Sequence, residues 1–286
     1  IMQLTKEKKI LIVGLGLIGG SYAQALSQQG FEVGAVDTCA KAIDYALDKH
    51  WIQSGRTTPE RDYIGRFDWI IFALYPHVFI EWIRDYQAYI KPRALLTDVT
   101  GVKSGIVYKI QEMLRSDLEF IGAHPMAGRE KSGVENADMH MFLGANYIVT
   151  PTDRNSREAI EACKSLGRVL GFGNISELSP EKHDEMIGFL SQLTHCIAVS
   201  LMICHDTQHL ADYAGDSFRD LTRIAKINDA MWSELFLMNK AALLSQMKLF
   251  DQKFHDLQDA IENDNEDKIR EMMRLSTERR IFYDNK

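Results

Sequence analysis

The chain has 286 residues, of which 45% are hydrophobic and 26% are charged, and its formal net charge is −7. These values are typical of a globular protein with about two domains. The acidic balance, without a basic cluster among aromatic residues, argues against a nucleic-acid partner. We expect no membrane partner, because no apolar run approaches the roughly 20 residues of a membrane span and no signal-peptide pattern opens the chain.

The four cysteines are scattered along the chain and form no C-x-x-C pair. This usage is typical of a reduced, cytoplasmic protein whose thiols are structural, and it predicts no metal site. The cysteines are Cys39, Cys163, Cys196 and Cys204.

The first predicted elements are a strand, a glycine turn and a helix. An apolar run over 9–13 leads into three glycines spaced as G-x-G-x-x-G, and a helix-like segment follows over 21–29. In such a turn the first glycine permits the tight bend, the second lets backbone approach a pyrophosphate, and the third lets the helix pack on the strand. The helix dipole also favours an anion there. The predicted cofactor-binding residues are Gly14, Leu15, Gly16, Leu17, Ile18 and Gly19.

A second apolar run over 31–36 ends in Asp37, roughly 20 residues past the first glycine of the turn. A dinucleotide-binding fold holds the adenosine ribose hydroxyls with an acidic residue at this place. The alternative interpretation of Asp37 is a solvated strand end. Because a carboxylate repels a 2′-phosphate, Asp37 favours NAD over NADP, and 9–37 is predicted to be a dinucleotide-binding βαβ unit.

Strand and helix patterns then alternate up to residue 178. Nearly continuous apolar runs predict buried strands, and three- and four-residue spacing predicts helices. The polar interval 53–66 is predicted to be a loop with a short surface helix, and 125–145 a long loop that is functional or mobile. The alternation predicts a doubly wound, mostly parallel α/β sheet. Strands are predicted at 67–74, 94–99, 118–123, 146–150 and 174–178, and helices at 40–49, 78–90, 104–115 and 156–170.

From Ser179 onward the pattern is helical throughout. Ser179 suits a helix N-cap and Pro180 the first helical position. The long helices carry apolar stripes that this segment is too small to enclose, so we expect a homodimer built through them. We predict a Rossmann-type dinucleotide-binding domain over 1–178 and an all-helical substrate and dimerisation domain over 179–286.

Polar residues at the carboxyl ends of the predicted strands are the candidates for chemistry, because ligands bind there in open α/β sheets. His124 follows an apolar strand, and an imidazole can take a hydroxyl proton as a hydride leaves. A capping histidine is the alternative. Leu74 and Thr100 are predicted to lie beside the cofactor, and Tyr75 and Asp98 are further candidates at this edge.

Several stretches, taken in order, resemble the prephenate/arogenate dehydrogenase family over about 9–240. The resemblance implies an NAD(P)-dependent oxidative decarboxylation on the route to tyrosine, in which prephenate is converted to 4-hydroxyphenylpyruvate. Because Asp37 favours NAD, we expect the reaction to be NAD-dependent. Hydride removal from the carbon bearing the ring hydroxyl gives a dienone, and loss of carbon dioxide then aromatises the ring. The matching stretches are GLGLIGGS at 14–21, DVTGVK at 98–103, GAHPMAG at 122–128, HD at 183–184, SQLTH at 191–195 and FRDLTRIA at 218–225.

The resemblance also implies roles for individual residues. His124 accepts the proton of the ring hydroxyl, and Arg223 binds a substrate carboxylate, which suits its bidentate fork. His195 lines the substrate pocket, and Arg219 is a nearby basic position. Without the resemblance, His195 would be read as a core histidine and Arg223 as a surface arginine. Three other histidines are interpreted as structural or exposed: His183, His205 and His209.

The chain departs from the family at Gly101, where many members carry a serine that contacts the ring hydroxyl. Thr100 is a candidate substitute on the substrate side, and Ser104 lies nearby. The chain ends too early for an appended regulatory domain and no chorismate mutase segment precedes the fold, so we expect a monofunctional enzyme. Whether tyrosine inhibits it is not encoded in any pattern named above.

Three alternative functions stay open from the sequence. The first is an arogenate dehydrogenase, since no residue named above reads the keto or amino group that distinguishes the two substrates. The second is a dehydrogenase of the β-hydroxyacid type. These enzymes usually place a catalytic lysine on the helical domain, and this chain has no comparable lysine in the expected context. The third is a nucleotide-sensing protein without turnover, which would need neither His124 nor Arg223.

Overall fold

The computed structural model describes residues 5–128, 131–206 and 208–284 of the chain. The chain divides into two compact units, Ile1–Asn239 and Lys240–Lys286, which we describe separately. The first contains the sheet and a group of helices ending with α11 (Asp229–Met238), and the second contains two helices. The functional boundary predicted after residue 178 stays a prediction.

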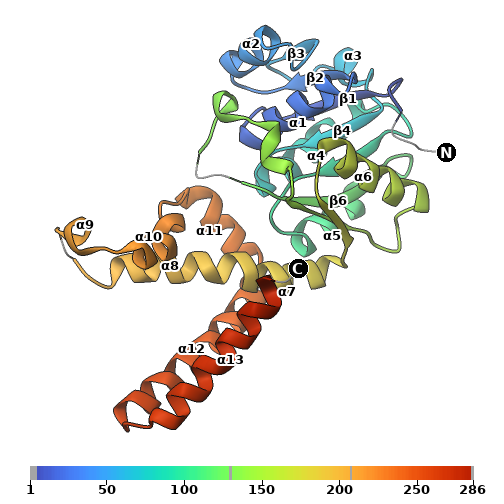
Figure 1. Ribbon diagram of the computed structural model, residues 1–286. Helices are drawn as coiled ribbons and strands as arrows, with labels where there is room; N and C mark the ends of the chain where they lie inside the picture. The colour runs from blue at the N-terminus through green and yellow to red at the C-terminus, as the bar shows by residue number, and fades with distance from the viewer. Residues whose placement is uncertain (1–4, 129–130, 207, 285–286) are drawn as a thin grey trace. The chain divides into compact units, whose positions relative to one another are not determined.

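Within the described part of the chain, eight strands form one sheet in the order β3-β2-β1-β4-β5-β6-β7-β8 (Figure 1). Neighbours pair in parallel except β6 and β7, which are antiparallel. The prediction of a mostly parallel, doubly wound sheet is confirmed. The strands are β1 (Lys9–Val13), β2 (Glu32–Val36), β3 (Ser54–Arg56), β4 (Trp69–Phe72), β5 (Leu95–Asp98), β6 (Glu119–Met126), β7 (Asn146–Thr150) and β8 (Asn174–Glu177).

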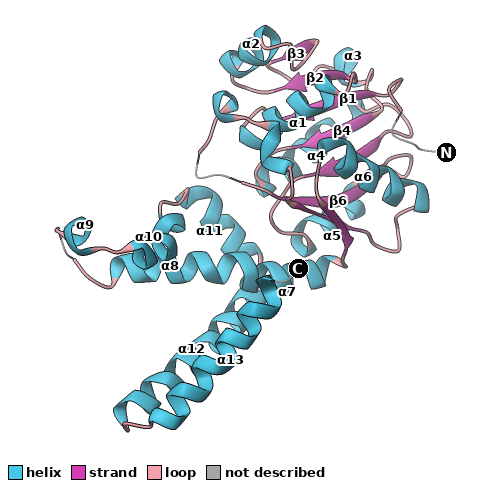
Figure 2. Cartoon of the chain, viewed as in Figure 1, coloured by secondary structure: helices cyan, strands magenta, loops and turns pink. Residues whose placement is uncertain are grey.

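Different helices cover the two faces of the sheet (Figure 2). Successive strand residues point to opposite faces, so Ile10 and Ile12 of β1 join one core and Leu11 and Val13 the other. The connections after the neighbouring strands β1 and β4 therefore leave toward opposite faces. Open α/β sheets bind ligands in the crevice at the carboxyl ends of two such strands. The first face carries α1 (Leu17–Gln28), α2 (Ala40–Asp48) and α6 (Arg157–Leu170), and the second carries α3 (Arg61–Ile64), α4 (Pro76–Tyr86) and α5 (Ser104–Met113).

β6 changes its pairing partner along its length. Its first part is parallel to β5, whereas Gly122–Met126 pair antiparallel with β7. Because β5 ends at Asp98, Pro125 has no β5 ladder bond to lose. The strand predicted over 118–123 therefore continues, and His124 lies within β6 rather than in a loop after it.

Two intervals predicted as loops contain regular structure. β3 lies in the interval 53–66 and was missed because it is a polar, three-residue edge strand paired with β2. The interval 125–145 holds two 3₁₀ turns, η2 (Val134–Asn136) and η3 (Met139–Phe142), and includes two residues outside the described ranges. Both turns pack against α1, so the described part of this interval is held by the nucleotide-binding face.

The helices after β8 begin as predicted, since the Ser179 side chain accepts from the Lys182 backbone N–H at the N-cap. The first three segments form one continuous helix over Pro180–Ile203, which includes a π-helical turn. The segments are α7 (Pro180–Ile187), η4 (Gly188–Leu193), α8 (Thr194–Ile203), α9 (Leu210–Tyr213), α10 (Asp216–Thr222), η5 (Arg223–Ala225) and α11 (Asp229–Met238).

The Pro180–Ile203 helix is more apolar than the sequence analysis recognised. It is long and apolar enough to cross a membrane by length and composition, with a mean hydropathy of 1.7 over 18 residues. The sequence analysis missed this stretch because glycine, serine and threonine interrupt its apolar residues without adding charge. One such helix is weak evidence of a span, since the core helix of a soluble protein passes the same test, and the expectation of no membrane partner stays a prediction.

The second unit consists of α12 (Lys240–Glu262) and α13 (Glu266–Asp284), which pack against each other (Figure 1). In the described residues of this unit, Leu243 and Ala260 are the buried apolar side chains. Many large apolar side chains remain exposed, including Phe250, Phe254 and Phe282. Exposed apolar area of this kind marks an interaction surface.

Candidate active site

The glycine turn between β1 and α1 has the backbone geometry that its motif predicts. Gly14 has a φ of +95°, and a Cβ there would collide with the Ala73 carbonyl. A Cβ on Gly19 would collide with the Gly14 carbonyl, so the helix can approach the strand only without a side chain. A Cβ on Gly16 meets no described atom within 4 Å, so the side of the turn where a pyrophosphate would lie is open.

Asp37 lies next to this turn at the carboxyl end of β2. One carboxylate oxygen accepts from the Leu15 backbone N–H at 2.6 Å, and the other accepts from the Cys39 N–H at 2.7 Å. Leu74, after β4, packs beside Gly14, because a Cβ built there would lie 3.0 Å from its Cδ2. The structure thus brings the predicted cofactor-binding residues of the turn, Asp37 and Leu74 together.

In the described structure no side chain caps the first turn of α1 at Gly16. Its N–H groups can therefore bind a ligand anion, and the fixed carboxylate of Asp37 has further lone pairs for hydroxyl donors. The turn, the helix terminus and Asp37 fit a dinucleotide whose ribose carries two hydroxyls.

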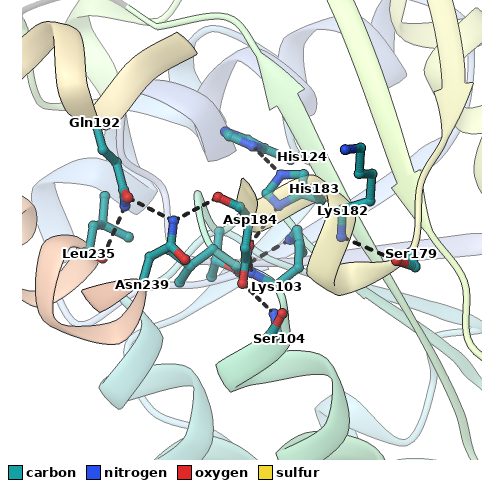
Figure 3. Close-up of polar contacts among 12 residues, drawn as sticks. Lys103, Ser104, His124, Ser179, Lys182, His183, Asp184, Gln192, Leu235 and Asn239 are labelled. Atoms are coloured by element: carbon teal, nitrogen blue, oxygen red, sulfur yellow. Dashed lines mark hydrogen bonds and ion pairs between the residues drawn. The ribbon is translucent and has the colours of Figure 1, made fainter. Parts of the chain in front are cut away.

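His124 is the first member of a chain of three polar side chains (Figure 3). Its Nδ1 lies 2.9 Å from Nε2 of His183, which α7 supplies. Nδ1 of His183 lies 2.8 Å from Oδ1 of Asp184. His124 is half-buried, whereas His183 is fully buried and Asp184 nearly so.

Asp184 is fixed to the start of α5. Oδ1 accepts from the Lys103 backbone N–H and Oδ2 from the Ser104 N–H, each at 2.8 Å. On the other side, Asn239 donates to the Asp184 carbonyl at 2.8 Å and to the Gln192 side chain at 2.8 Å. Asp184 therefore links α7 to α5 while its carboxylate faces His183 (Figure 3).

Burial sets the protonation states of the two histidines. It lowers the pKa of His124 well below its ordinary value of 6.5, and His183 and Lys103 lower this pKa further. Burial also lowers the pKa of His183, although Asp184 opposes that shift. Both imidazoles are neutral at pH 7, and a neutral imidazole is the form that accepts a proton.

A buried ion pair lies beneath His124. Lys103 Nζ donates to Asp98 Oδ2 at 2.7 Å, and both side chains are 0% exposed. Asp98 also accepts from the Ala123 N–H at 3.1 Å, next to His124 in β6. Breaking a buried pair of this kind costs about 3–5 kcal/mol, because the remaining charge has no partner.

Thr100 belongs to this buried network. Its hydroxyl makes a short contact with Asp98, lies 2.9 Å from the Val102 carbonyl, and accepts from Lys103 Nζ at 3.2 Å. The residue is 4% exposed. The structure therefore places this hydroxyl among protein partners, which leaves it poorly placed to replace the family serine. Ser104 uses its backbone N–H to bind Asp184.

α11 packs near both candidate histidines. A Cβ on Gly101 would lie 3.6 Å from Leu235 of α11 and 3.9 Å from Cε1 of His124. One turn away on α11, Trp232 stacks on His195 with ring centroids 3.7 Å apart. α11 therefore brings His124 and His195 to one region at the carboxyl edge of the sheet.

Polar contacts hold α11 against the start of α4 and its N-cap residue, Tyr75. Glu234 accepts from the His77 backbone N–H at 2.7 Å, and Asn228 donates to the Tyr75 hydroxyl at 3.2 Å. His195 donates from Nδ1 to the Ser191 carbonyl at 2.8 Å.

The two candidate arginines lie on segments that pack against α8, the helix that carries His195. Arg219 is in α10 and Arg223 begins η5, and both are exposed. The Arg219 guanidinium donates to Asp216 at 2.8 Å and to the Ala214 carbonyl at 3.1 Å. The described contacts give these arginines no direct link to His124.

Sequence reasoning missed His183 and Asp184 as site residues. The adjacent His-Asp pair was a usable signal, because it puts two polar side chains in the first half of the helix that follows the Ser179 N-cap. Their contact with His124 was not visible, since it joins residues 59 positions apart.

A comparison with protein families matches 22–171 to a model described as prephenate dehydrogenase, nucleotide-binding domain. A second match covers 179–275 and is described as prephenate dehydrogenase, dimerization domain. The chain belongs to the prephenate dehydrogenase family. The resemblance drawn from the sequence motifs is thereby confirmed.

Similar proteins from two bacteria carry the name of this family. The prephenate dehydrogenase of Bacillus subtilis is 32% identical over 83% of this chain, and that of Lactococcus lactis is 31% identical over 85%. The chain spans 66% and 68% of the lengths of these two proteins. Among solved structures, a prephenate dehydrogenase from Aquifex aeolicus with hydroxyphenyl propionate and NAD⁺ is similar, with a TM-score of 0.88 and 29% identity. The match covers 96% of this chain and 98% of that one.

Proposed function

We propose that this chain is an NAD-dependent prephenate dehydrogenase that converts prephenate to 4-hydroxyphenylpyruvate and carbon dioxide. The observation that carries the proposal is the neutral, half-buried His124 at the carboxyl edge of the sheet, hydrogen-bonded through Nδ1 to His183. A neutral imidazole held in this way is suited to accept the proton of the ring hydroxyl. The family membership and the dinucleotide-binding turn support the same reaction.

NAD is the cofactor, held at the turn over 14–19 with Leu74 beside it. The N–H groups at the start of α1 bind the pyrophosphate, and Asp37 binds the ribose hydroxyls. When bound, NAD supplies the hydride acceptor. Asp37 selects against NADP because its carboxylate repels a 2′-phosphate.

His124 takes the ring-hydroxyl proton, so that the carbon bearing the hydroxyl can become a carbonyl. In the resulting dienone the bond to the ring carboxylate breaks and carbon dioxide is released. The electron pair of that bond stays with the ring and reaches the carbonyl oxygen, which regains the proton from His124 as the ring becomes aromatic. Arg223 binds a substrate carboxylate, and Arg219 adds positive charge near it. His195, which is stacked on Trp232, lines the substrate pocket. Prephenate is a dianion, so the site needs cations of this kind.

The chain is also proposed to be a cytoplasmic homodimer, with nucleotide binding in 1–178 and substrate binding and dimerisation in 179–286. The exposed apolar side chains of α12 and α13, and the apolar Pro180–Ile203 helix within the dimerization-domain match, support burial against a second copy. Light scattering of the purified chain without detergent is expected to give twice the 32.6 kDa protomer mass. A detergent-dependent or monomeric species would contradict this assignment.

The reaction is tested by incubating the pure chain with prephenate and NAD while following NADH absorbance and the product. Arogenate with NAD, prephenate with NADP and a β-hydroxyacid with NAD are parallel arms, each repeated with His124→Asn. We expect prephenate with NAD to give the highest kcat/KM, and His124→Asn to remove most of the rate. Faster turnover of arogenate or of the β-hydroxyacid would replace this function by the corresponding alternative.

A further inference from the structure

His183 faces Nδ1 of His124 and is itself held by Asp184. His183 Nε2 lies 2.9 Å from His124 Nδ1, and His183 Nδ1 lies 2.8 Å from Asp184 Oδ1. No water separates these groups at such distances, so each ring nitrogen must act as either donor or acceptor toward its neighbour.

The backbone of α5 decides which role each atom takes. The Lys103 and Ser104 N–H groups donate to both oxygens of Asp184, which is the arrangement of an ionised carboxylate. Burial raises the pKa of Asp184, but His183 and these N–H groups more than offset it, so the pKa lies below its ordinary value. Asp184 is therefore an acceptor, and Nδ1 of His183 must donate to it.

The donation from His183 to Asp184 also determines which nitrogen of His124 carries a proton. A neutral His183 that carries its proton on Nδ1 has an unprotonated Nε2, which can only accept. Nδ1 of His124 must then be the donor, and the lone pair of the neutral His124 ring lies on Nε2. One tautomer of each ring satisfies all these contacts, and it directs the basic nitrogen of His124 away from His183.

We propose that His183 and Asp184 are positioning residues that hold His124 in the tautomer whose Nε2 is unprotonated. The proposal rests on the proposed function, because it assigns Nε2 of His124 as the atom that takes the substrate proton. It goes beyond that function because it gives the orienting work to residues that need not touch the substrate.

A helix-linking role alone would not account for these contacts. Asp184 could join α7 to α5 through the two backbone N–H bonds without a histidine beside it. His183 is fully buried, and the side chains at its two ring nitrogens are His124 and Asp184. Burying a polar ring is favourable only when its nitrogens are hydrogen-bonded, so both contacts matter.

Other charged groups around His183 do not reverse the assignment. Lys103 faces the pair from the start of α5, and Asp98 faces it from β5. These two groups neutralise each other in a buried ion pair. As the pH falls, protonation of His183 at Nε2 would place two N–H donors against each other, one on each ring. The hydrogen bond from Nδ1 of His124 to Nε2 of His183 would then be lost.

The tautomers can be read without any substrate. ¹⁵N-labelled histidine spectra of the full chain, assigned with His124→Asn and His183→Gln, report which nitrogen of each ring carries the proton. We expect a protonated Nδ1 on both rings in the wild type. Asp184→Asn places an amide beside His183 and is expected to change the protonation pattern of both rings.

Kinetics separate positioning from folding. Asp184→Asn and His183→Leu are expected to lower kcat between about 10²- and 10⁴-fold with little change in the KM for NAD. His183→Gln keeps an acceptor near the place of Nε2 and should recover much of the loss. Asn239→Ala is the matched control, because it removes a contact to the same segment through the Asp184 carbonyl and leaves the imidazole chain intact.

The result that supports the proposal is an Nδ1-protonated His124 in the wild type, with this state lost in Asp184→Asn and retained in Asn239→Ala. An Nε2-protonated, Nδ1-free His124 in the wild type would overturn it. Equal kcat losses in His183→Gln, His183→Leu and Asn239→Ala would overturn it as well. If prephenate proves not to be the substrate, the proposed function fails, while the tautomer spectra still decide this inference.

Discussion

The candidate site has two parts, the surroundings of His124 and the two arginines Arg219 and Arg223. They differ in how firmly contacts within the chain hold the side chains in place. His124 of β6 is held by a chain of groups on α7 and at the start of α5, each at 2.8–2.9 Å from the next. Arg219 and Arg223 lie exposed on α10 and η5, and Arg219 binds its own helix neighbourhood. The half proposed to accept the proton is preorganised, whereas the half proposed to bind the carboxylate is open to solvent.

Preorganised and exposed groups contribute to different steps of catalysis. Preorganised groups lower the free energy of the transition state, because they need no rearrangement during the reaction. Exposed cations contribute mainly to substrate binding, and part of that gain is spent on ordering their long side chains. Variants in the two halves are therefore expected to change different kinetic constants.

The largest effect is expected for His124→Asn. An asparagine amide can still donate toward His183, but it has no atom in place of Nε2 to accept the proton. We expect kcat to fall about 10²–10⁴-fold with a smaller change in KM, in steady-state assays with prephenate and NAD. A near wild-type kcat would move the base elsewhere and remove the contrast between the halves.

Arg223→Ala should act mainly on KM. A charge-assisted pair to a carboxylate that is present before and during the reaction contributes to both states, so its loss weakens binding by roughly 10²-fold. Arg219→Ala is the comparison, with a smaller rise in KM because Arg219 is assigned only a positive charge near the carboxylate and not the direct contact. An Arg223→Ala variant that loses kcat with KM unchanged would place the arginine in the preorganised half.

Asp37→Ala is expected to have the smallest effect, and it concerns the cofactor. Removing the carboxylate removes its repulsion of a 2′-phosphate and its contacts to ribose hydroxyls. The ratio of kcat/KM for NAD to that for NADP should narrow by about 10-fold, or about 1.4 kcal/mol. A wild-type preference for NADP would contradict the role of Asp37.

The contrast also explains what could be predicted from the sequence. The glycine turn is local, and its spacing alone fixed the places of Gly14, Gly16 and Gly19 around the strand and helix. His183 was interpreted as structural or exposed because its partner, His124, is distant in the chain and meets it only through the packing of α7.

Two other features depended on tertiary contacts. Thr100 was proposed as a substrate contact, but its hydroxyl is buried against Asp98 because Lys103 folds back over both residues. β3 carries no apolar pattern, since an edge strand of three residues can be specified by its pairing with β2. Local patterns thus predicted the geometry of the glycine turn better than the contacts around His124.

The central claim, a preorganised neutral His124 that accepts the substrate proton, is tested most directly by the pH dependence of kcat/KM. A base must be unprotonated, so activity is present above the pKa of His124 and is lost as the pH falls through it. Because burial lowers that pKa, wild-type kcat/KM for prephenate at saturating NAD should stay level down to its ordinary value of 6.5 and decline only below it. The account predicts that this acid limb disappears in His124→Asn, and an identical limb in both proteins would contradict it.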